Sequence, residues 1–289
     1  MHYETVKGIL SPHNGMNLYR GCTHGCIYCD SRSVCYGMKH AFEDVAVKEN
    51  ALDLLEKALR GKRKRCMIGT GSMSDPYMPL EAELCYTRRA LELMERYGFG
   101  ATLITKSARV LRDIDLLARI NRKAKCVVQM TLTTYDEELC RKIEPHVSTT
   151  RERFEALCAL RDAGIPTVVW LCPILPYIND TRENIEGILS YCVEAQVKGI
   201  LSFGMGLTLR EGNREYFYAQ LDRLFPGMKE RYVREFGNAY ELVSPRHGEL
   251  MRLMHDTCES HGILCDNGAI FAYLSALEEK PIGEQLSLF

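Results

Sequence analysis

Three cysteines near the start of the chain have the spacing of metal ligands. Cys22, Cys26 and Cys29 follow the pattern C-x3-C-x2-C within residues 17–29. Thiolates at this spacing reach three corners of a [4Fe–4S] cubane. Ordinary electron-transfer clusters use four cysteines, and no fourth follows here at a usual ferredoxin interval. The missing ligand leaves one iron open, so the pattern predicts a cluster that coordinates something other than protein.

A zinc site is the alternative for the same loop. Structural zinc takes four ligands, and His24 or Cys35 would have to supply the fourth. His24 lies between two of the cysteines, where reaching the same ion would strain the loop. Gly21 and Gly25 allow the backbone to wrap closely around a bulky group, which favours the cluster.

The composition is that of a balanced globular chain. Its 289 residues carry a formal net charge of −1 and are 46% hydrophobic. A protein held to DNA mainly by phosphate contacts is usually clearly basic, so that class is disfavoured. No run approaches the roughly 18 to 20 apolar residues of a membrane-spanning helix, and residues 1–10 lack a secretion pattern. We therefore expect a cytoplasmic protein without a membrane partner. Most other cysteines, Cys172 among them, stand singly in apolar runs and are expected in the core.

Short apolar runs alternate with helical patterns over most of the chain. Strands are expected at residues 16–21, 66–70, 101–106, 126–132, 167–175 and 199–205. Helices are expected near residues 49–59, 81–97, 110–120, 149–163 and 181–194, with a capping box at Thr149 and Glu152. Such alternation implies a parallel sheet, and six units are too few for a closed barrel of eight strands. The expected fold is α/β, a partial (β/α)6 TIM-like barrel with its chemistry at the C-terminal ends of the strands.

Three regions follow from this pattern. Residues 1–206 form the expected barrel. Residues 207–277 form a mostly helical C-terminal extension that packs across the barrel mouth, and residues 210–253 show no clear strand. Residues 278–289, with a proline, a glycine and several charges, are expected to be a mobile tail.

The cluster loop and the motifs after it resemble a known family. C-x3-C-x2-C with an aromatic residue, Tyr28, before the last cysteine is similar to the signature of radical S-adenosylmethionine (SAM) enzymes. The wider pattern resembles the spore photoproduct lyase-like family within them. The matching pieces are residues 17–29, 72–81, 105–107, 112–113, 144–145, 153, 163–166, 173, 176 and 179–180.

The resemblance implies cofactors and a mechanism. The open iron of a [4Fe–4S] cluster binds the amino and carboxylate groups of SAM, and an external electron donor reduces the cluster. Reductive cleavage then yields a 5′-deoxyadenosyl radical that abstracts hydrogen from substrate. The family's DNA-lesion member implies a lyase-like enzyme with DNA or another nucleic acid as partner. That member uses a cysteine near the second loop as hydrogen donor, whereas residues 69–81 contain none. The O–H bond of Ser72 is a poor substitute, so repair of spore photoproduct itself is not predicted.

Residues at the expected strand ends are the candidates for binding SAM. The loop after the second strand resembles the family's glycine-rich segment beside the methionine amino group, and its candidates are Gly69, Thr70, Gly71 and Ser72. Tyr28 is expected to contact the adenine. Lys106 ends an apolar strand, so its ammonium must meet an anion or water, and the resemblance makes that anion the methionine carboxylate. Thr131 and Thr133 are candidates for the ribose hydroxyls, although threonine is common in strands in any case.

A polar set is expected beside that site. Asp75, Tyr77 and Glu81 either bind substrate or orient the loop. Arg210 stands among tyrosines, and such mixtures can clamp bases, whereas aromatic residues at helical spacing also form cores. Glu144 is expected to be a structural brace of its loop.

The end of the chain carries a short linear pattern. Gln285, Leu286, Leu288 and Phe289 closely resemble the bacterial sliding-clamp-binding pentapeptide, in which apolar anchors occupy a preformed groove. The alternative is a hydrophobic end that packs on its own barrel. The clamp interpretation implies a DNA-associated enzyme with the clamp as partner.

Three functions are compatible with these patterns. The leading one is a radical SAM enzyme that acts on nucleic acid in DNA repair or modification. The second is a non-catalytic iron–sulfur accessory protein that docks on the sliding clamp. The third is a radical SAM enzyme that acts on a protein or a small molecule.

Overall fold

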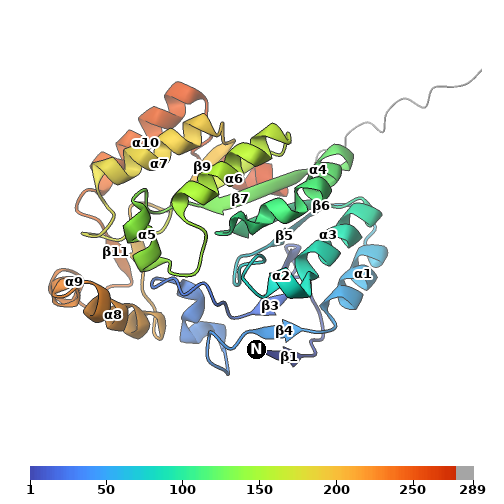
Figure 1. Ribbon diagram of the computed structural model, residues 1–289, viewed down its shortest axis with the longest axis horizontal. Helices are drawn as coiled ribbons and strands as arrows, with labels where there is room; N and C mark the ends of the chain where they lie inside the picture. Colours follow the sequence, from blue (N-terminus) through green and yellow to red (C-terminus); the bar gives the residue numbers. More distant parts are fainter. Residues whose placement is uncertain (278–289) are drawn as a thin grey trace, which may run out of the picture.

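Six parallel strands form the centre of the computed structural model, which describes residues 1–277 (Figure 1). They are β2 (Gly15–Met16), β5 (Met67–Thr70), β6 (Gly100–Thr105), β7 (Cys126–Thr131), β8 (Thr167–Trp170) and β9 (Gly199–Leu201). Their order in the sheet is their order in the chain, and every neighbouring pair is parallel. This is the arrangement of a TIM-like barrel left open between β2 and β9, which confirms the predicted fold class.

Helices cover the outer face of this sheet (Figure 1). They are α1 (Ala51–Gly61), α3 (Tyr86–Tyr97), α4 (Ile114–Lys123), α6 (Thr150–Asp162) and α7 (Arg182–Glu194). Each buries one apolar face, as α1 does with Leu52, Leu55 and Leu59, and each fully buried leucine contributes about 1.5–3 kcal/mol. The predicted capping box of Thr149 and Glu152 is present at the start of α6.

The inner face of the sheet is filled at one end by the last helix. Val127, Val168 and Leu201 alternate with outward-facing neighbours along their strands, and they pack with Ile270 and Leu274 of α11 (Asn267–Ser275). The residues next to them in sequence belong to the larger core under the outer helices. The inner face is therefore closed beside the strand starts by α11.

Several elements end earlier than the sequence predicts. The first strand splits into β2 in the main sheet and β3 (Tyr19–Arg20), which joins β4 (Ala46–Lys48) and β1 (His2–Glu4) in a separate sheet. β8 and β9 stop at Trp170 and Leu201. The predicted helix over residues 81–97 is broken by Cys85 at φ 53° into α2 (Glu81–Leu84) and α3.

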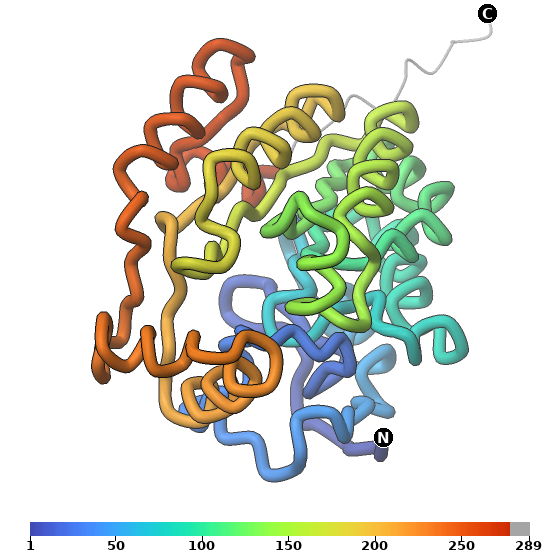
Figure 2. Tube along the Cα trace, turned by 60° about the vertical axis from the view of Figure 1, so that its left-hand side comes forward, coloured from blue at the N-terminus to red at the C-terminus, as the bar shows by residue number. Residues whose placement is uncertain are grey.

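The C-terminal extension packs beside the N-terminal segment. It is mostly helical, as predicted, with α8 (Asn213–Leu224), α9 (Met228–Phe236) and α10 (His247–His261). Figure 2 shows α8 and α9 in orange against the blue N-terminal segment, where Phe217 and Tyr232 share an apolar cluster with Ile27 and Tyr28. The prediction of no strand was wrong, because β10 (Gly206–Thr208) pairs with β11 (Glu241–Val243). β11 was missed because it is short and only its central residue, Leu242, is buried.

None of the helices within residues 1–277 combines the length and apolar character needed to cross a membrane.

Candidate active site

The three predicted ligand cysteines lie together on the loop that follows β3. Cys22 and Cys26 are only 8% and 6% exposed, and Cys29 opens on a cavity. All three are free thiols. The loop thus presents three sulfur ligands on the inside of the molecule, beside the ends of the strands.

Neighbouring segments hold this loop on both sides. The Cys22 N–H donates to the carbonyl oxygen of Phe42 at 3.0 Å, and the Ile27 N–H donates to that of Ile143 at 3.0 Å. Gly21 has a φ of +90°, and a Cβ there would lie 2.4 Å from the Phe42 oxygen. The close approach of these two backbones therefore requires glycine just before the first cysteine.

The spread of the three sulfurs distinguishes a cluster from a single ion. Zinc with Zn–S bonds of about 2.3 Å would bring its sulfur ligands to about 3.8 Å from one another. Within residues 1–277, the one group of three metal-binding atoms closer together than 4.8 Å contains none of these cysteines. The three thiols do not converge on one point in this structure, and three protein sulfurs are the donor set of a larger cluster with one open corner.

Burial makes the free thiols difficult to ionise. It raises the pKa of Cys22 to about 12 and the pKa of Cys26 well above its ordinary value, although the charge of Lys106 opposes the shift at Cys26. Metal binding requires the thiolate and releases the proton. The positive charge of bound iron would supply the compensation that these buried positions otherwise lack.

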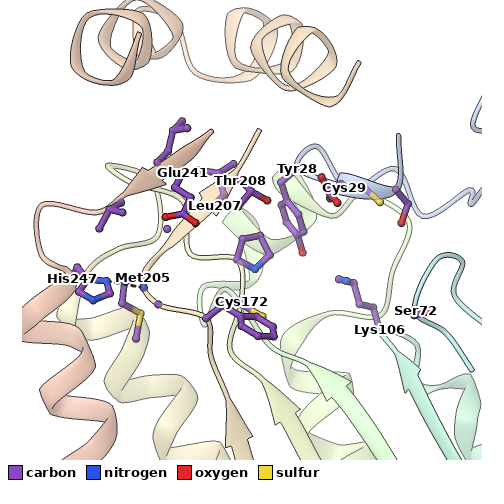
Figure 3. Close-up of a pocket in the computed structure, with 18 residues that line it drawn as sticks. Tyr28, Cys29, Ser72, Lys106, Cys172, Met205, Leu207, Thr208, Glu241 and His247 are labelled. Atoms are coloured by element: carbon purple, nitrogen blue, oxygen red, sulfur yellow. Dashed lines mark hydrogen bonds between the residues drawn. The ribbon is translucent and has the colours of Figure 1, made fainter. Parts of the chain in front are cut away.

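A cavity of about 420 Å³ opens beside Cys29, at the C-terminal ends of the strands (Figure 3). Ser72 follows β5, Lys106 follows β6, Cys172 follows β8 and Phe203 follows β9, and all four line its wall. Strand ends therefore carry the functional groups, as the barrel topology predicts.

Lys106 presents its ammonium group to this cavity (Figure 3). Nζ lies 5.8 Å from the centre of the Tyr28 ring. Burial by itself lowers the pKa of Lys106, but the acidic groups around it, Cys26 and Glu144 first among them, outweigh burial when they are ionised, and the net pKa is raised. The ammonium is therefore charged at neutral pH and is suited to bind a carboxylate.

The loop after β5 runs close to the backbone of β6. Gly71 has a φ of +99°, and a Cβ there would lie 2.1 Å from the carbonyl oxygen of Ile104. Ser72 reaches the cavity wall, whereas Gly69 and Thr70 lie within β5 itself. Of the four predicted residues, Ser72 contacts the cavity and Gly71 shapes the turn that brings it there.

A buried ion pair between Glu144 and Arg153 fixes the hydroxyl of Tyr28. Glu144 follows α5 (Glu137–Ile143) and accepts hydrogen bonds from the Tyr28 hydroxyl and the Arg153 guanidinium. Burial by itself raises the pKa of Glu144, but Arg153 and Lys106 outweigh it, so the net pKa is lowered. Glu144 is thus the structural brace that the sequence predicts, and it fixes Tyr28 of the cluster loop.

Thr131 and Thr133 belong to this brace and are absent from the cavity wall. The Thr131 carbonyl accepts a hydrogen bond from Arg153 Nη1 at 2.7 Å, and Thr133 Oγ1 lies 3.5 Å from Glu144 Oε1. Both side chains are buried. Neither lines the cavity, and the predicted contact with the ribose stays a prediction.

Asp75 joins the cluster loop to the strand end that carries Lys106. Its Oδ1 accepts a hydrogen bond from Thr105 Oγ1 at 2.7 Å, and its Oδ2 accepts one from the Lys106 N–H at 2.7 Å. His24 Nδ1 lies 3.4 Å from the same Oδ2. Of the two roles predicted for Asp75, the geometry supports orientation of the loops.

Tyr77 and Glu81 are fully buried away from the cavity. The Tyr77 hydroxyl donates to Asp113 at 3.1 Å, and Glu81 pairs with Arg112 at 2.9 Å. Neither lines the cavity, and of the two roles predicted for them this geometry supports orientation of the loop.

Arg210 fastens the C-terminal extension to the segment after Cys29. Its guanidinium lies 2.7 Å from Asp30 Oδ2 and donates to the hydroxyls of Tyr36 and Tyr240 at 2.8 Å each. Asp30 lines the cavity. Arg210 is thus engaged within the protein, one step behind the cavity wall.

The predicted clamp-binding residues Gln285, Leu286, Leu288 and Phe289 lie outside the described residues. Clamp binding stays a prediction.

The sequence analysis missed much of the cavity wall. Cys172 was assigned to the core, and burial does raise the pKa of its thiol to about 12, so that it stays protonated. Its position just after β8 was the available signal. Met205, at the end of the strand expected over residues 199–205, also lines the cavity. So do Thr208 and His247, which come from the extension, where no strand-end rule applies.

Comparison with known proteins gives a family and several relatives for this chain. A sequence model of the Radical SAM superfamily matches residues 16–192. An uncharacterized protein of Mycobacterium tuberculosis is 29% identical over 248 residues, which cover 82% of this chain and 71% of the relative. A radical SAM Nalpha-GlyT isomerase of Pseudomonas phage M6 is 24% identical over 168 residues, which cover 57% of this chain and 34% of the isomerase.

Solved structures share the fold at low sequence identity. Spore photoproduct lyase complexed with dinucleoside spore photoproduct superposes with a TM-score of 0.64 at 16% identity, covering 86% of this chain and 74% of that one. A variant of that enzyme with AdoMet and the dinucleoside bound gives a TM-score of 0.59 at 15% identity over the same shares of the two chains.

Proposed function

The chain belongs to the radical SAM superfamily, and from this premise we propose that it is an enzyme whose substrate is a modified or damaged nucleotide of a nucleic acid. Its cofactors are a [4Fe–4S] cluster and SAM. When bound, they supply a 5′-deoxyadenosyl radical that abstracts a hydrogen atom from the substrate. An external donor provides the electron.

Different residues around the cavity bind the cluster and the parts of SAM. Cys22, Cys26 and Cys29 hold the cluster. Lys106 binds the carboxylate of the methionine moiety, and Ser72, carried on the Gly71 turn, lies beside its amino group. The ring of Tyr28, held by the hydrogen bond between its hydroxyl and Glu144, bounds the space for the adenine.

An exposed aromatic wall carries the substrate proposal. Phe203 lines the cavity yet is 66% exposed, and its ring centre lies 5.9 Å from that of Trp170 and 6.4 Å from that of Phe271. Bases stack on such surfaces with about 1–3 kcal/mol each. Enzymes that act on a base also take it out of the helix into a pocket. The ammonium of Lys106 and this aromatic wall thus supply places for the cosubstrate and for a nucleobase.

The comparisons support the same substrate class. The solved lyase with this fold is complexed with dinucleoside spore photoproduct. Residues 69–81 lack the cysteine that the lesion enzyme uses, so we propose a lesion or modified base other than spore photoproduct. Residues 207–208, 241–243 and 247 of the extension line the cavity, and we propose that this part of the extension helps to exclude water from the site.

Anaerobic turnover tests the proposal. Cluster-loaded protein is reduced with dithionite and mixed with SAM alone, with damaged or modified oligonucleotides, or with a peptide pool, and 5′-deoxyadenosine is measured. We expect cleavage of SAM above a Cys26→Ala control, and stimulation by the oligonucleotides only. A matched Cys35→Ala variant, which changes an exposed cysteine outside the ligand set, should retain activity.

The outcomes separate the three functions. If the protein makes no more 5′-deoxyadenosine than the Cys26→Ala control, it is an iron–sulfur accessory protein without this chemistry. Stimulation by peptides alone would replace the nucleic-acid substrate by a protein. Phe203→Ala should raise the KM for the oligonucleotide without changing SAM cleavage in its absence, because only the stacking wall is altered.

A further inference from the structure

A second set of metal-binding side chains lies apart from the cavity. We propose that His2, His40 and Asp44 form a binding site for a divalent transition-metal ion, with zinc as the best-fitting ion. Within residues 1–277 they are the one set of three potential ligands whose donor atoms all lie within 4.8 Å of one another. Two imidazoles with one carboxylate is a donor set that zinc uses, with water in the fourth position.

The hydrogen bonding of His40 leaves a lone pair for the metal. Its Nδ1 lies 3.0 Å from the carbonyl oxygen of Ala41. A carbonyl can only accept, so Nδ1 carries the proton and Nε2 is the unprotonated nitrogen. Nε2 is buried and has no hydrogen-bond partner among the described residues. An imidazole N–H donated to a backbone carbonyl is the usual outer-shell arrangement of a metal-bound histidine.

His2 contributes the second imidazole of the group. Its buried Nδ1 lies 3.0 Å from Asp44 Oδ2, so these two donor atoms are already in contact. The two imidazole rings meet edge to face, with centres 4.8 Å apart. Asp44 also pairs through Oδ1 with the Met1 amino group at 2.7 Å, which leaves Oδ2 on the side of the histidines.

The side chains can close on an ion without moving the backbone. A tetrahedral zinc with bonds of about 2.0–2.1 Å places its ligand atoms about 3.3 Å apart. The side chains of His2 and Asp44 are 40% and 44% exposed, so the ion has a path of entry, and its binding would replace their direct contact with each other. The backbone of His2 is fixed, because β1 pairs with β4 at the register His2–Ala46.

The site joins the N-terminal strand to a loop that supports the cluster. His40 and Asp44 flank Phe42, whose carbonyl oxygen accepts the N–H of Cys22 at 3.0 Å. A bound ion would hold both ends of this short loop, and with it the backbone contact of the first cluster cysteine. We therefore assign the ion a structural role outside the chemistry.

Metal analysis of the full, cluster-loaded chain tests the site. Protein is dialysed anaerobically against graded Zn²⁺ concentrations, and zinc and iron are measured together. The wild type should bind one zinc per chain. The variants His40→Ala, His2→Ala and the nearly isosteric Asp44→Asn should bind it with an affinity at least about tenfold weaker. His13→Ala, which removes an exposed histidine outside the group, is the matched control and should bind as the wild type does.

Iron content and thermal stability complete the test. Iron should remain equal in all variants, which distinguishes loss of this site from loss of the cluster. Zinc should raise the melting temperature of the wild type and of His13→Ala by several degrees, and leave that of Asp44→Asn unchanged. Equal zinc affinity in the wild type and the three site variants, or no zinc in the wild type, would show that these residues form only an ion pair.

Discussion

The link between Tyr28 and Glu144 joins the cluster loop to the barrel over 116 positions of sequence, and removing it should have a measurable cost. In Glu144→Ala the fully buried Arg153 loses its carboxylate partner. Removing one partner of a buried pair costs about 3–5 kcal/mol. Arg153 keeps hydrogen bonds to the carbonyls of Thr131 at 2.7 Å and Ser148 at 2.8 Å. We therefore expect the lower end, about 3 kcal/mol.

The hydroxyl of Tyr28 makes a smaller, separable contribution. Tyr28→Phe removes one hydrogen bond to a charged acceptor, worth about 1.5–3 kcal/mol. In a Glu144→Ala background the same change should cost little, because the acceptor is already gone. The double-mutant cycle should therefore give a coupling energy of at least about 1.5 kcal/mol, whereas independent sites add to within about 0.5 kcal/mol.

Denaturant unfolding of the cluster-loaded variants measures this coupling. Tyr218→Phe is the matched control, because the Tyr218 hydroxyl is buried without a hydrogen-bond partner among the described residues. It should be nearly neutral and additive with Glu144→Ala. Additivity of Tyr28→Phe with Glu144→Ala, or a coupling as large for Tyr218→Phe, would refute the brace.

The same carboxylate predicts a dependence on acid. The net pKa of Glu144 is lower in the folded protein than its ordinary value, because Arg153 and Lys106 outweigh the effect of burial. Its contribution to stability is therefore complete above the unfolded pKa of about 4.3 and is lost as pH falls through the lower folded pKa. Glu144→Gln should flatten this acid limb of the stability profile, and an unchanged limb would contradict the assignment.

Further predictions concern the turn, the extension and the cavity thiol. Gly71→Ala should cost roughly 3 kcal/mol and impair SAM binding, because of its positive φ and the Ile104 oxygen. Gly61→Ala, where a Cβ meets nothing within 4 Å, should be neutral in the same melts. Arg210→Ala should cost about 1 kcal/mol or less, as a half-exposed ion pair does, and raise hydrogen exchange in α8. A general loss of protection would contradict that local role. Cys172 should resist iodoacetamide at pH 8 under conditions that label exposed Cys35, because its thiol pKa is about 12. Equal labelling by mass spectrometry would show that the thiol is open and ionised.

Local patterns in the sequence determined the cluster loop, the parallel sheet and most helix positions. Cys22, Cys26 and Cys29 are close in sequence, so their spacing alone indicates shared ligation. The capping box of α6 and the alternation of strands and helices are also local, because they depend on hydrogen bonds and side-chain periodicity within a few residues. Lys106 was found in the same way, as a charge at the end of an apolar strand.

The tertiary structure alone decided which of the other candidates meet the cavity. Tyr77 and Glu81 are polar and follow the second strand of the barrel in sequence, yet their partners turn them into the core. Leu242 and His247 come to the cavity from β11 and α10, elements whose placement depends on long-range packing. His2 meets His40 only because β1 pairs with β4. Such contacts follow from the burial of whole faces across distant segments, and no spacing within the chain encodes them.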